Sequence, residues 1–346
     1  MSVKKYRIAL WGTGNVGLSS LRAVIEHPQM ELVALRVFSE TKAGRDAGEL
    51  CGMPPNGIIA TRKLDVTIAA RPDCVIYLPH HSELDDMCRL LEAGINITTA
   101  CIGFNHRGSI EPAARARLEA ACALGRSSLY ATGSSPGWST EIMPFALLAM
   151  QRRLDCLTIT DYADLSSRNS PEMIFNVIGF GADPANMDPG RPVGTAASTP
   201  PTFRALADAI GLPLDEVTTS VEYAVTRKRE TIAAGALQAG TIGAMRMGVI
   251  GLRNGRPILR RFSCWYVTRD LDPPWQLQDS GWRMQVDGDT SLDVSIAFMV
   301  SQENYFSYSP GLTAHPVVNA APYVCDAAPG ILHTSELPMI IPYLGS

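Results

Sequence analysis

A glycine pattern near the amino end has the spacing of a phosphate-binding turn. Gly12, Gly14 and Gly17 stand in a segment that matches G-x-G-x-x-G. The first glycine allows a tight turn, the second lets the backbone approach a pyrophosphate, and the third lets a helix pack closely on a strand. The apolar run before the motif, residues 6–11, predicts a strand, and residues 18–27 predict a helix whose N-terminus attracts phosphate. The predicted dinucleotide contacts are Gly12, Gly14, Asn15, Val16 and Gly17.

The residues after the second predicted strand, 31–38, bear on which dinucleotide is bound. An NAD-specific site usually places Asp or Glu here to accept from the ribose hydroxyls. This chain has Ser39 at about that position, with Lys42 and Arg45 close behind. A hydroxyl and nearby cations suit a 2′-phosphate, so the pattern favours NADP, with NAD possible. Glu40 lies one position late and could still turn inward, and the two cations could equally be solvated loop charges.

Two further predicted strands, residues 73–79 and 95–101, end in candidate contacts for the same cofactor. Ligands of a doubly wound sheet bind at the carboxyl ends of its parallel strands. The predicted contacts there are Leu78, Pro79, His80, Thr99, Ala100 and Cys101. His80 and His81 are neighbours that project in different directions, so we expect no metal site at this pair.

Hydride transfer requires a group that manages one proton and a pocket that orients the substrate. A carbonyl substrate needs a hydrogen-bond donor, and an iminium substrate needs a nearby anion. The catalytic candidates are His106, Tyr162 and Glu172, and the candidate substrate-pocket residues are Trp138, Asp161 and His315. Each also has a structural interpretation, such as a core aromatic or a charge at a helix terminus.

The order of predicted elements divides the chain into two kinds of domain. Strands and helices alternate up to Gly137, which predicts a doubly wound parallel sheet, or Rossmann domain, over residues 1–137. A strand over 154–165 and long alternating segments over 218–227, 241–253, 258–268 and 291–300 then predict a mostly antiparallel α+β domain over 138–311, for substrate binding and dimerisation. We expect residues 312–346, with a helix over 316–328, to return to the first domain.

Composition excludes several classes of function. Lys and Arg total 30 against 34 Asp and Glu, a net charge of −4, so no surplus of cations exists to bind nucleic acid. No run of about 18 apolar residues offers a membrane span, and no secretory signal is visible. The eight scattered cysteines include no C-x-x-C pair, as expected for free thiols in a reducing compartment. We therefore expect a soluble, cytoplasmic protein.

Several motifs together resemble a known family. They are the glycine turn, residues 42–52 (KAGRDAGELCG), the turn 133–137, the segment 170–181 from Ser-Pro-Glu-Met to Gly-Phe-Gly, and the tail motifs at 318–322 and 328–330. They are similar to the 2,4-diaminopentanoate dehydrogenase and native amine dehydrogenase family, whose first domain is related to dihydrodipicolinate reductase. The resemblance implies a nicotinamide-dependent oxidoreductase, usually dimeric, that acts on a C=O or C=N carbon of a small ketone, imine, amine or alcohol.

Two departures limit what this resemblance implies. The paired-histidine, lysine and P-S-G-T motifs of dihydrodipicolinate reductases are absent from the second half. Family members that aminate ketones use a glutamate just after the strand that here ends at Cys101, and this chain has Ile102. A carboxylate can activate ammonia or bind an iminium cation, whereas isoleucine can do neither. Two alternatives therefore stay open: an enzyme that keeps its cofactor and catalyses a lyase or isomerase step, and a non-catalytic dinucleotide sensor.

Overall fold

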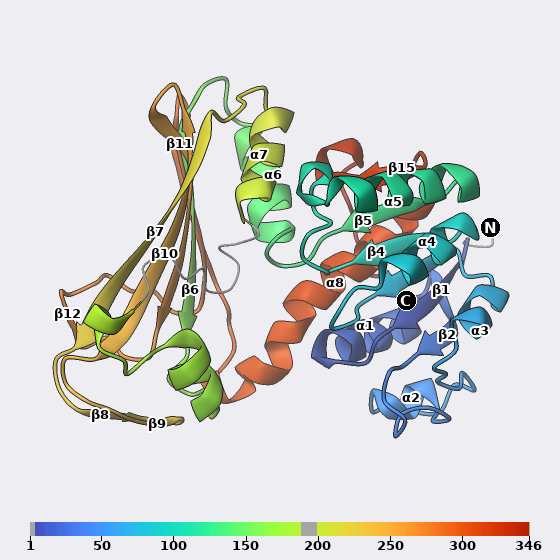
Figure 1. Ribbon diagram of the computed structural model, residues 1–346, viewed down its shortest axis with the longest axis horizontal. Helices are drawn as coiled ribbons and strands as arrows, with labels where there is room; N and C mark the ends of the chain where they lie inside the picture. The colour runs from blue at the N-terminus through green and yellow to red at the C-terminus, as the bar shows by residue number, and fades with distance from the viewer. Residues whose placement is uncertain (1–3, 188–198, 346) are drawn as a thin grey trace. The chain divides into compact units, whose positions relative to one another are not determined.

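The chain divides into two compact units, each with its own sheet. The computed structural model describes residues 4–187 and 199–345. The first unit comprises Met1–Trp138 and Phe306–Ser346, and the second comprises Ser139–Tyr305 (Figure 1).

A six-stranded parallel sheet forms the centre of the first unit. Its strand order is β15-β5-β4-β3-β1-β2, and every neighbouring pair is parallel. The strands are β1 Tyr6–Trp11, β2 Met30–Arg36, β3 Cys74–Tyr77, β4 Asn96–Thr99, β5 Ser128–Ala131 and β15 Gly330–Leu332. The predicted doubly wound parallel sheet is confirmed, and β15 from the chain's tail extends it.

Helices cover both faces of this sheet because successive strand residues point to opposite sides. Ile8 and Leu10 of β1 pack in a core with α1 and α8, whereas Ala9 and Trp11 pack with α4 and α5. The helices of the first unit are α1 Asn15–Glu26, α2 Ala47–Leu50, α3 Leu64–Ala69, α4 Leu84–Glu92, α5 Pro112–Gly125 and α8 Tyr305–Cys325. Because all six strands are parallel, their carboxyl ends lie along one edge of the sheet, between the two helix layers (Figure 1).

The helix of the tail corrects a prediction. We expected it to begin at Pro316, but α8 begins at Tyr305 and runs through Pro310, Pro316 and Pro322. Each proline removes a backbone donor and disfavours a helix interior. Burial of Val317 and other small apolar residues of α8 in the α1-side core offsets that cost, which the local pattern does not reveal.

A seven-stranded, mostly antiparallel sheet forms the second unit, as predicted. Its order is β12-β7-β10-β11-β6-β13-β14, and the pair β11–β6 is parallel. The strands are β6 Leu154–Asp164, β7 Glu216–Thr226, β10 Ile242–Arg253, β11 Arg256–Tyr266, β12 Leu271–Asp272, β13 Gly281–Gly288 and β14 Leu292–Ala297, and a hairpin pairs β8 Glu230–Ile232 with β9 Gly235–Leu237.

The helices of the second unit pack on one face of its sheet (Figure 1). These are α6 Met143–Leu148, α7 Thr199–Ala209 and a π-helical turn, Glu172–Ile178, which contact the sheet through two apolar clusters. Strand alternation places Tyr162, Arg246 and Arg260 on the other face. We call this second surface the open face.

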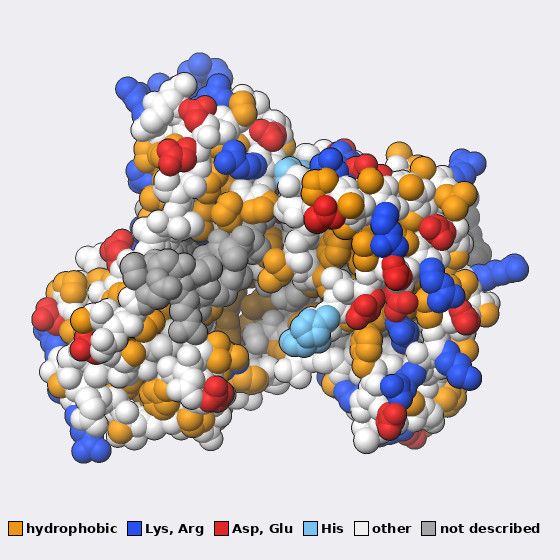
Figure 2. Space-filling model, viewed as in Figure 1, with side chains coloured by type: hydrophobic (Ala, Val, Ile, Leu, Met, Phe, Trp, Pro, Cys, Tyr) orange, Lys and Arg blue, Asp and Glu red, His pale blue; other side chains and the backbone are white. Residues whose placement is uncertain are grey.

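The described residues include no helix that is long and apolar enough to cross a membrane. Acidic and basic side chains are interspersed on the surface that Figure 2 shows, without a broad area of either sign.

Candidate active site

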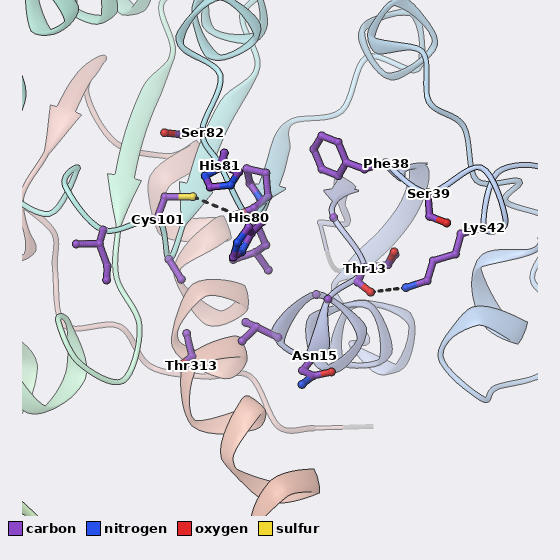
Figure 3. A pocket seen from close by; sticks show the side chains of 18 residues that line it. Thr13, Asn15, Phe38, Ser39, Lys42, His80, His81, Ser82, Cys101 and Thr313 are labelled. Carbon is purple, nitrogen blue, oxygen red and sulfur yellow. Dashed lines mark hydrogen bonds between the residues drawn. The ribbon is translucent and has the colours of Figure 1, made fainter. Parts of the chain in front are cut away.

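A cavity of about 880 Å³ lies at the carboxyl edge of the parallel sheet in the first unit (Figure 3). Its walls are the glycine turn 12–17, the segments that follow β2, β3 and β4, and one residue of α8, Thr313. Strands of a parallel sheet end side by side, so the fold itself gathers these separate segments.

The glycine turn forms the floor of this cavity. The backbone of Gly12 has φ +101°, and a Cβ there would lie 2.4 Å from the carbonyl oxygen of Leu78. A Cβ on Gly17 would lie 2.1 Å from the carbonyl oxygen of Gly12, so α1 can approach β1 only with glycine at this position. A Cβ on Gly14 would meet no protein atom within 4 Å. The protein therefore does not need glycine at position 14, and the open space beside it fits a bound group.

The first turn of α1 completes the fit for a diphosphate. Gly14 is the N-cap residue, no side chain caps the helix, and no acidic residue occupies its first turn. Backbone N–H groups at such a terminus are free to donate to an anion, and the helix dipole attracts negative charge. Asn15 and Val16 of this turn also line the cavity. The residues present thus fit the diphosphate of a nicotinamide dinucleotide.

The loop after β2 supplies the cationic end of the cavity. Phe38, Ser39 and Lys42 line it, and Lys42 Nζ donates to the carbonyl oxygen of Thr13 at 2.7 Å (Figure 3). The carboxylate of Glu40 instead pairs with Arg62 at 2.7 Å. The end of β2 therefore presents a hydroxyl and a cation to the cavity. Arg45, a predicted contact, does not line it.

The segments after β3 and β4 form the other walls. Leu78, Pro79 and His80 line the cavity, as do Ala100 and Cys101. Thr99 is fully buried below them, where its hydroxyl donates to the carbonyl oxygen of Tyr77 at 2.6 Å.

The hydroxyl oxygen of Thr99 also accepts from the backbone N–H of Cys101 at 3.0 Å, so Thr99 shapes the end of β4 without touching the cavity. Burial raises the pKa of the Cys101 thiol, which favours its neutral form.

Three predicted catalytic or substrate-pocket residues of the first unit, His106, Trp138 and His315, lie outside this cavity. His106 begins a short 3-10 helix, where its ring accepts from the N–H of Gly108 at 3.1 Å. His315 is exposed and lines a separate cavity of about 430 Å³, formed with the end of α1 and the tail. Trp138 begins a π-helical turn and is the last residue of the first unit before the chain enters the second unit at Ser139.

Asp161 and Tyr162, in the second unit, are consecutive residues of β6 and point to opposite faces of its sheet. The carboxylate of Asp161 pairs with Arg261 at 2.9 Å and accepts from Ser263 Oγ at 2.9 Å. Tyr162 lines a cavity of about 340 Å³ on the open face, and burial raises the pKa of its phenol. The side chains of Asp161 and Tyr162 therefore do not belong to one site within the second unit.

Glu172 lies in the π-helical turn, where its side chain accepts from Asn176 Nδ2. It is exposed, as expected for a charge near a helix terminus.

Several residues of the main cavity were missed from sequence. They are Thr13, Phe38, His81, Ser82, Ile102 and Thr313. The first five adjoin predicted contacts in the chain, so extending each predicted segment by one or two residues finds them. No local signal marks Thr313. In addition, the described residues hold no group of three or more side chains suited to a metal ion.

Comparisons with known proteins find similar sequences and folds over most of the chain. Residues 6–120 match the family model for the N-terminus of dihydrodipicolinate reductase. An amine dehydrogenase of Streptomyces virginiae is 29% identical over 350 residues, covering 95% of each chain. The structure of an amine dehydrogenase from Mycobacterium smegmatis matches with a TM-score of 0.70 at 19% identity, over 97% of both chains.

A dipicolinate-bound dihydrodipicolinate reductase from Paenisporosarcina sp. TG-14 matches with a TM-score of 0.50 at 13% identity, over 96% of this chain and 98% of that one.

The fold, the glycine turn and these similarities make the chain an NAD(P)-dependent oxidoreductase. The resemblance to amine dehydrogenases is confirmed over nearly the whole chain, with a dihydrodipicolinate reductase-like N-terminal domain.

Proposed function

We propose that the chain is an NADP-preferring oxidoreductase that moves a hydride to or from a C=O or C=N carbon of a small, mostly apolar substrate. The open space beside Gly14 carries this proposal, because it adjoins a helix terminus that no side chain caps and a diphosphate fits both features. The dinucleotide supplies the hydride chemistry when bound. The chain's own residues bind the cofactor and orient it.

The cationic end of the cavity supports the preference for NADP. Ser39 and Lys42 face the space where β2 ends, and the nearby acid, Glu40, is paired with Arg62. An ammonium group attracts a 2′-phosphate, and among the residues that the structure describes no carboxylate lines the cavity to repel it.

Replacing Lys42 with alanine is expected to lower the preference for NADPH over NADH at least tenfold, since a charge-assisted hydrogen bond contributes about 1.5–3 kcal/mol. The ratio of the two Kd values, measured by calorimetry, gives the result. Lys63→Ala is the matched control, because Lys63 is an exposed lysine of the same region that does not line the cavity, and the pair between Arg62 and Glu40 stays intact. An unchanged ratio in Lys42→Ala would show that this lysine does not read the phosphate.

The substrate class follows from the other end of the cavity. Ile102 lines it with its side chain 60% exposed, next to the thiol of Cys101. An apolar surface of this kind suits a ketone or imine with apolar substituents. NADPH oxidation over a panel of ketones, run with and without ammonium, tests the proposal. Oxidation without ammonium indicates carbonyl reduction, a strict need for it indicates reductive amination, and no oxidation with any ketone contradicts the proposed function.

We further propose that the chain forms a homodimer through the open face of the second unit. Arg260 and Asp287 both line the cavity on that face, and neither forms an ion pair with a residue that the structure describes. A two-fold contact brings the same surface of each copy together, so the arginine of one copy can pair with the aspartate of the other.

The eight cysteines are free thiols, which supports a reducing, cytoplasmic setting.

Reversing one charge in Arg260→Glu is expected to weaken the dimer at least tenfold, because like charges then meet twice at a two-fold interface. Combining Arg260→Glu with Asp287→Arg restores opposite charges and should restore the dimer. Sedimentation velocity of the wild type and both variants measures this. A monomeric wild type, or a double variant as weak as the single one, would refute the interface.

A further inference from the structure

We propose that Thr313 of α8 holds the nicotinamide end of the cofactor through its hydroxyl. This inference rests on the proposed dinucleotide site and extends it to a residue in the last tenth of the chain. Thr313 lines the same cavity as the glycine turn, and Figure 3 shows its side chain and Lys42 on opposite sides of the cavity.

The sheet order orients the cofactor in the cavity. The 2′-phosphate end lies at Lys42 after β2, and the diphosphate lies at the glycine turn after β1. The remaining end must then run past β3 toward β4, about 14 Å from β2 at about 4.8 Å per strand. The nicotinamide is therefore expected near Ala100, Cys101 and Ile102.

Thr313 lies at this far end. A Cβ on Gly133 would be 3.2 Å from Cγ2 of Thr313 and 3.8 Å from Cβ of Ala100. Gly133 follows β5, so Thr313 packs beside the ends of β4 and β5. The absence of a side chain at Gly133 lets α8 bring Thr313 this close.

The hydroxyl of Thr313 is turned away from its own helix. A threonine inside a helix commonly donates to the carbonyl four residues earlier. Here Oγ1 of Thr313 lies 2.8 Å from Oγ of Ser134, its hydrogen-bond partner among the described residues. This contact fixes the direction of the hydroxyl of Thr313, which is a residue of the cavity wall.

A threonine hydroxyl has one hydrogen to donate and two lone pairs that accept. It can therefore keep its contact with Ser134 and form a second hydrogen bond. A carboxamide offers both an acceptor oxygen and N–H donors, so it can meet the hydroxyl in either direction. No other hydroxyl on α8 lines the cavity in the part of the chain that the structure describes.

The test separates the two ends of the cofactor with two ligands. Adenosine 2′,5′-bisphosphate carries the adenosine and phosphate end only, whereas NADP⁺ carries both ends. Thr313→Val keeps the shape and removes the hydroxyl. We expect it to raise the Kd of NADP⁺ about five- to tenfold, the loss of one hydrogen bond, and to leave the Kd of the bisphosphate unchanged. Lys42→Ala should raise the Kd of both ligands.

Thr313→Ser keeps the hydroxyl and removes the methyl group that packs on Gly133, so it should bind NADP⁺ within about twofold of the wild type. If Thr313→Val does not fold, Ser134→Ala replaces it and should weaken NADP⁺ binding selectively. Equal weakening of both ligands, no weakening, or a Thr313→Ser variant as weak as Thr313→Val would overturn the inference. A wild type that binds neither ligand would instead refute the dinucleotide site.

Discussion

Replacing Gly14 with valine is expected to raise the Kd of NADPH at least about 100-fold while leaving the fold intact. The backbone of Gly14 has φ −73°, which any residue adopts, and a Cβ there meets no protein atom within 4 Å. The new side chain therefore enters the space assigned to the diphosphate and excludes it. Calorimetric titration measures the Kd, and thermal unfolding checks that the midpoint is preserved.

Gly17→Ala is the matched comparison for this variant. Its Cβ would lie 2.1 Å from the carbonyl oxygen of Gly12, so the helix and turn must shift and the protein should lose stability as well as affinity. A Gly14→Val protein that binds NADPH like the wild type would show that the diphosphate does not occupy the turn.

Removing the charge of Asp161 is expected to cost about 2–4 kcal/mol of unfolding free energy. The side chain of Arg261 is 5% exposed and that of Asp161 is 18% exposed, and the two pair at 2.9 Å. Asp161→Asn removes the carboxylate that accepts from both Arg261 and Ser263, and breaking a buried ion pair by removing one partner is strongly destabilising. Urea denaturation monitored by circular dichroism gives the change.

The control for this prediction lies on the same strand. Asp155 pairs with Arg153 at 2.9 Å, but both side chains are more than half exposed, so Asp155→Asn should change stability by less than about 0.5 kcal/mol. Both variants should keep wild-type affinity for NADPH, because the cavity belongs to the first unit. Equal stability of Asp161→Asn and the wild type would mean that Asp161 is free to contact a substrate cation.

The parts of the cavity predicted from sequence are those that local patterns encode. The glycine turn follows a strand and opens a helix, and the residues at the ends of β3 and β4 follow short apolar runs. Strand order then brings these segments together without further information, since parallel strands end at one edge. The predicted contacts from Gly12 to Gly17, and those at Leu78, Pro79 and Cys101, line the cavity for this reason.

Residues whose role depends on distant partners could not be predicted in this way. Asp161 resembles a free anion in sequence, but its partner Arg261 comes from a strand 100 positions later. Thr313 reaches the cavity because α8 runs through three prolines, and a proline in a sequence ordinarily indicates a helix boundary. In the second unit β13 was missed, although the alternation of Met284 and Val286 with polar residues marks it as a strand.

The central claim is that the glycine turn holds a nicotinamide dinucleotide. Titration of the purified wild type with NADPH in a calorimeter tests this directly. We expect saturable binding of one NADPH per chain, with a lower Kd than that of NADH. The absence of measurable heat for either nucleotide at millimolar concentration would contradict the central claim.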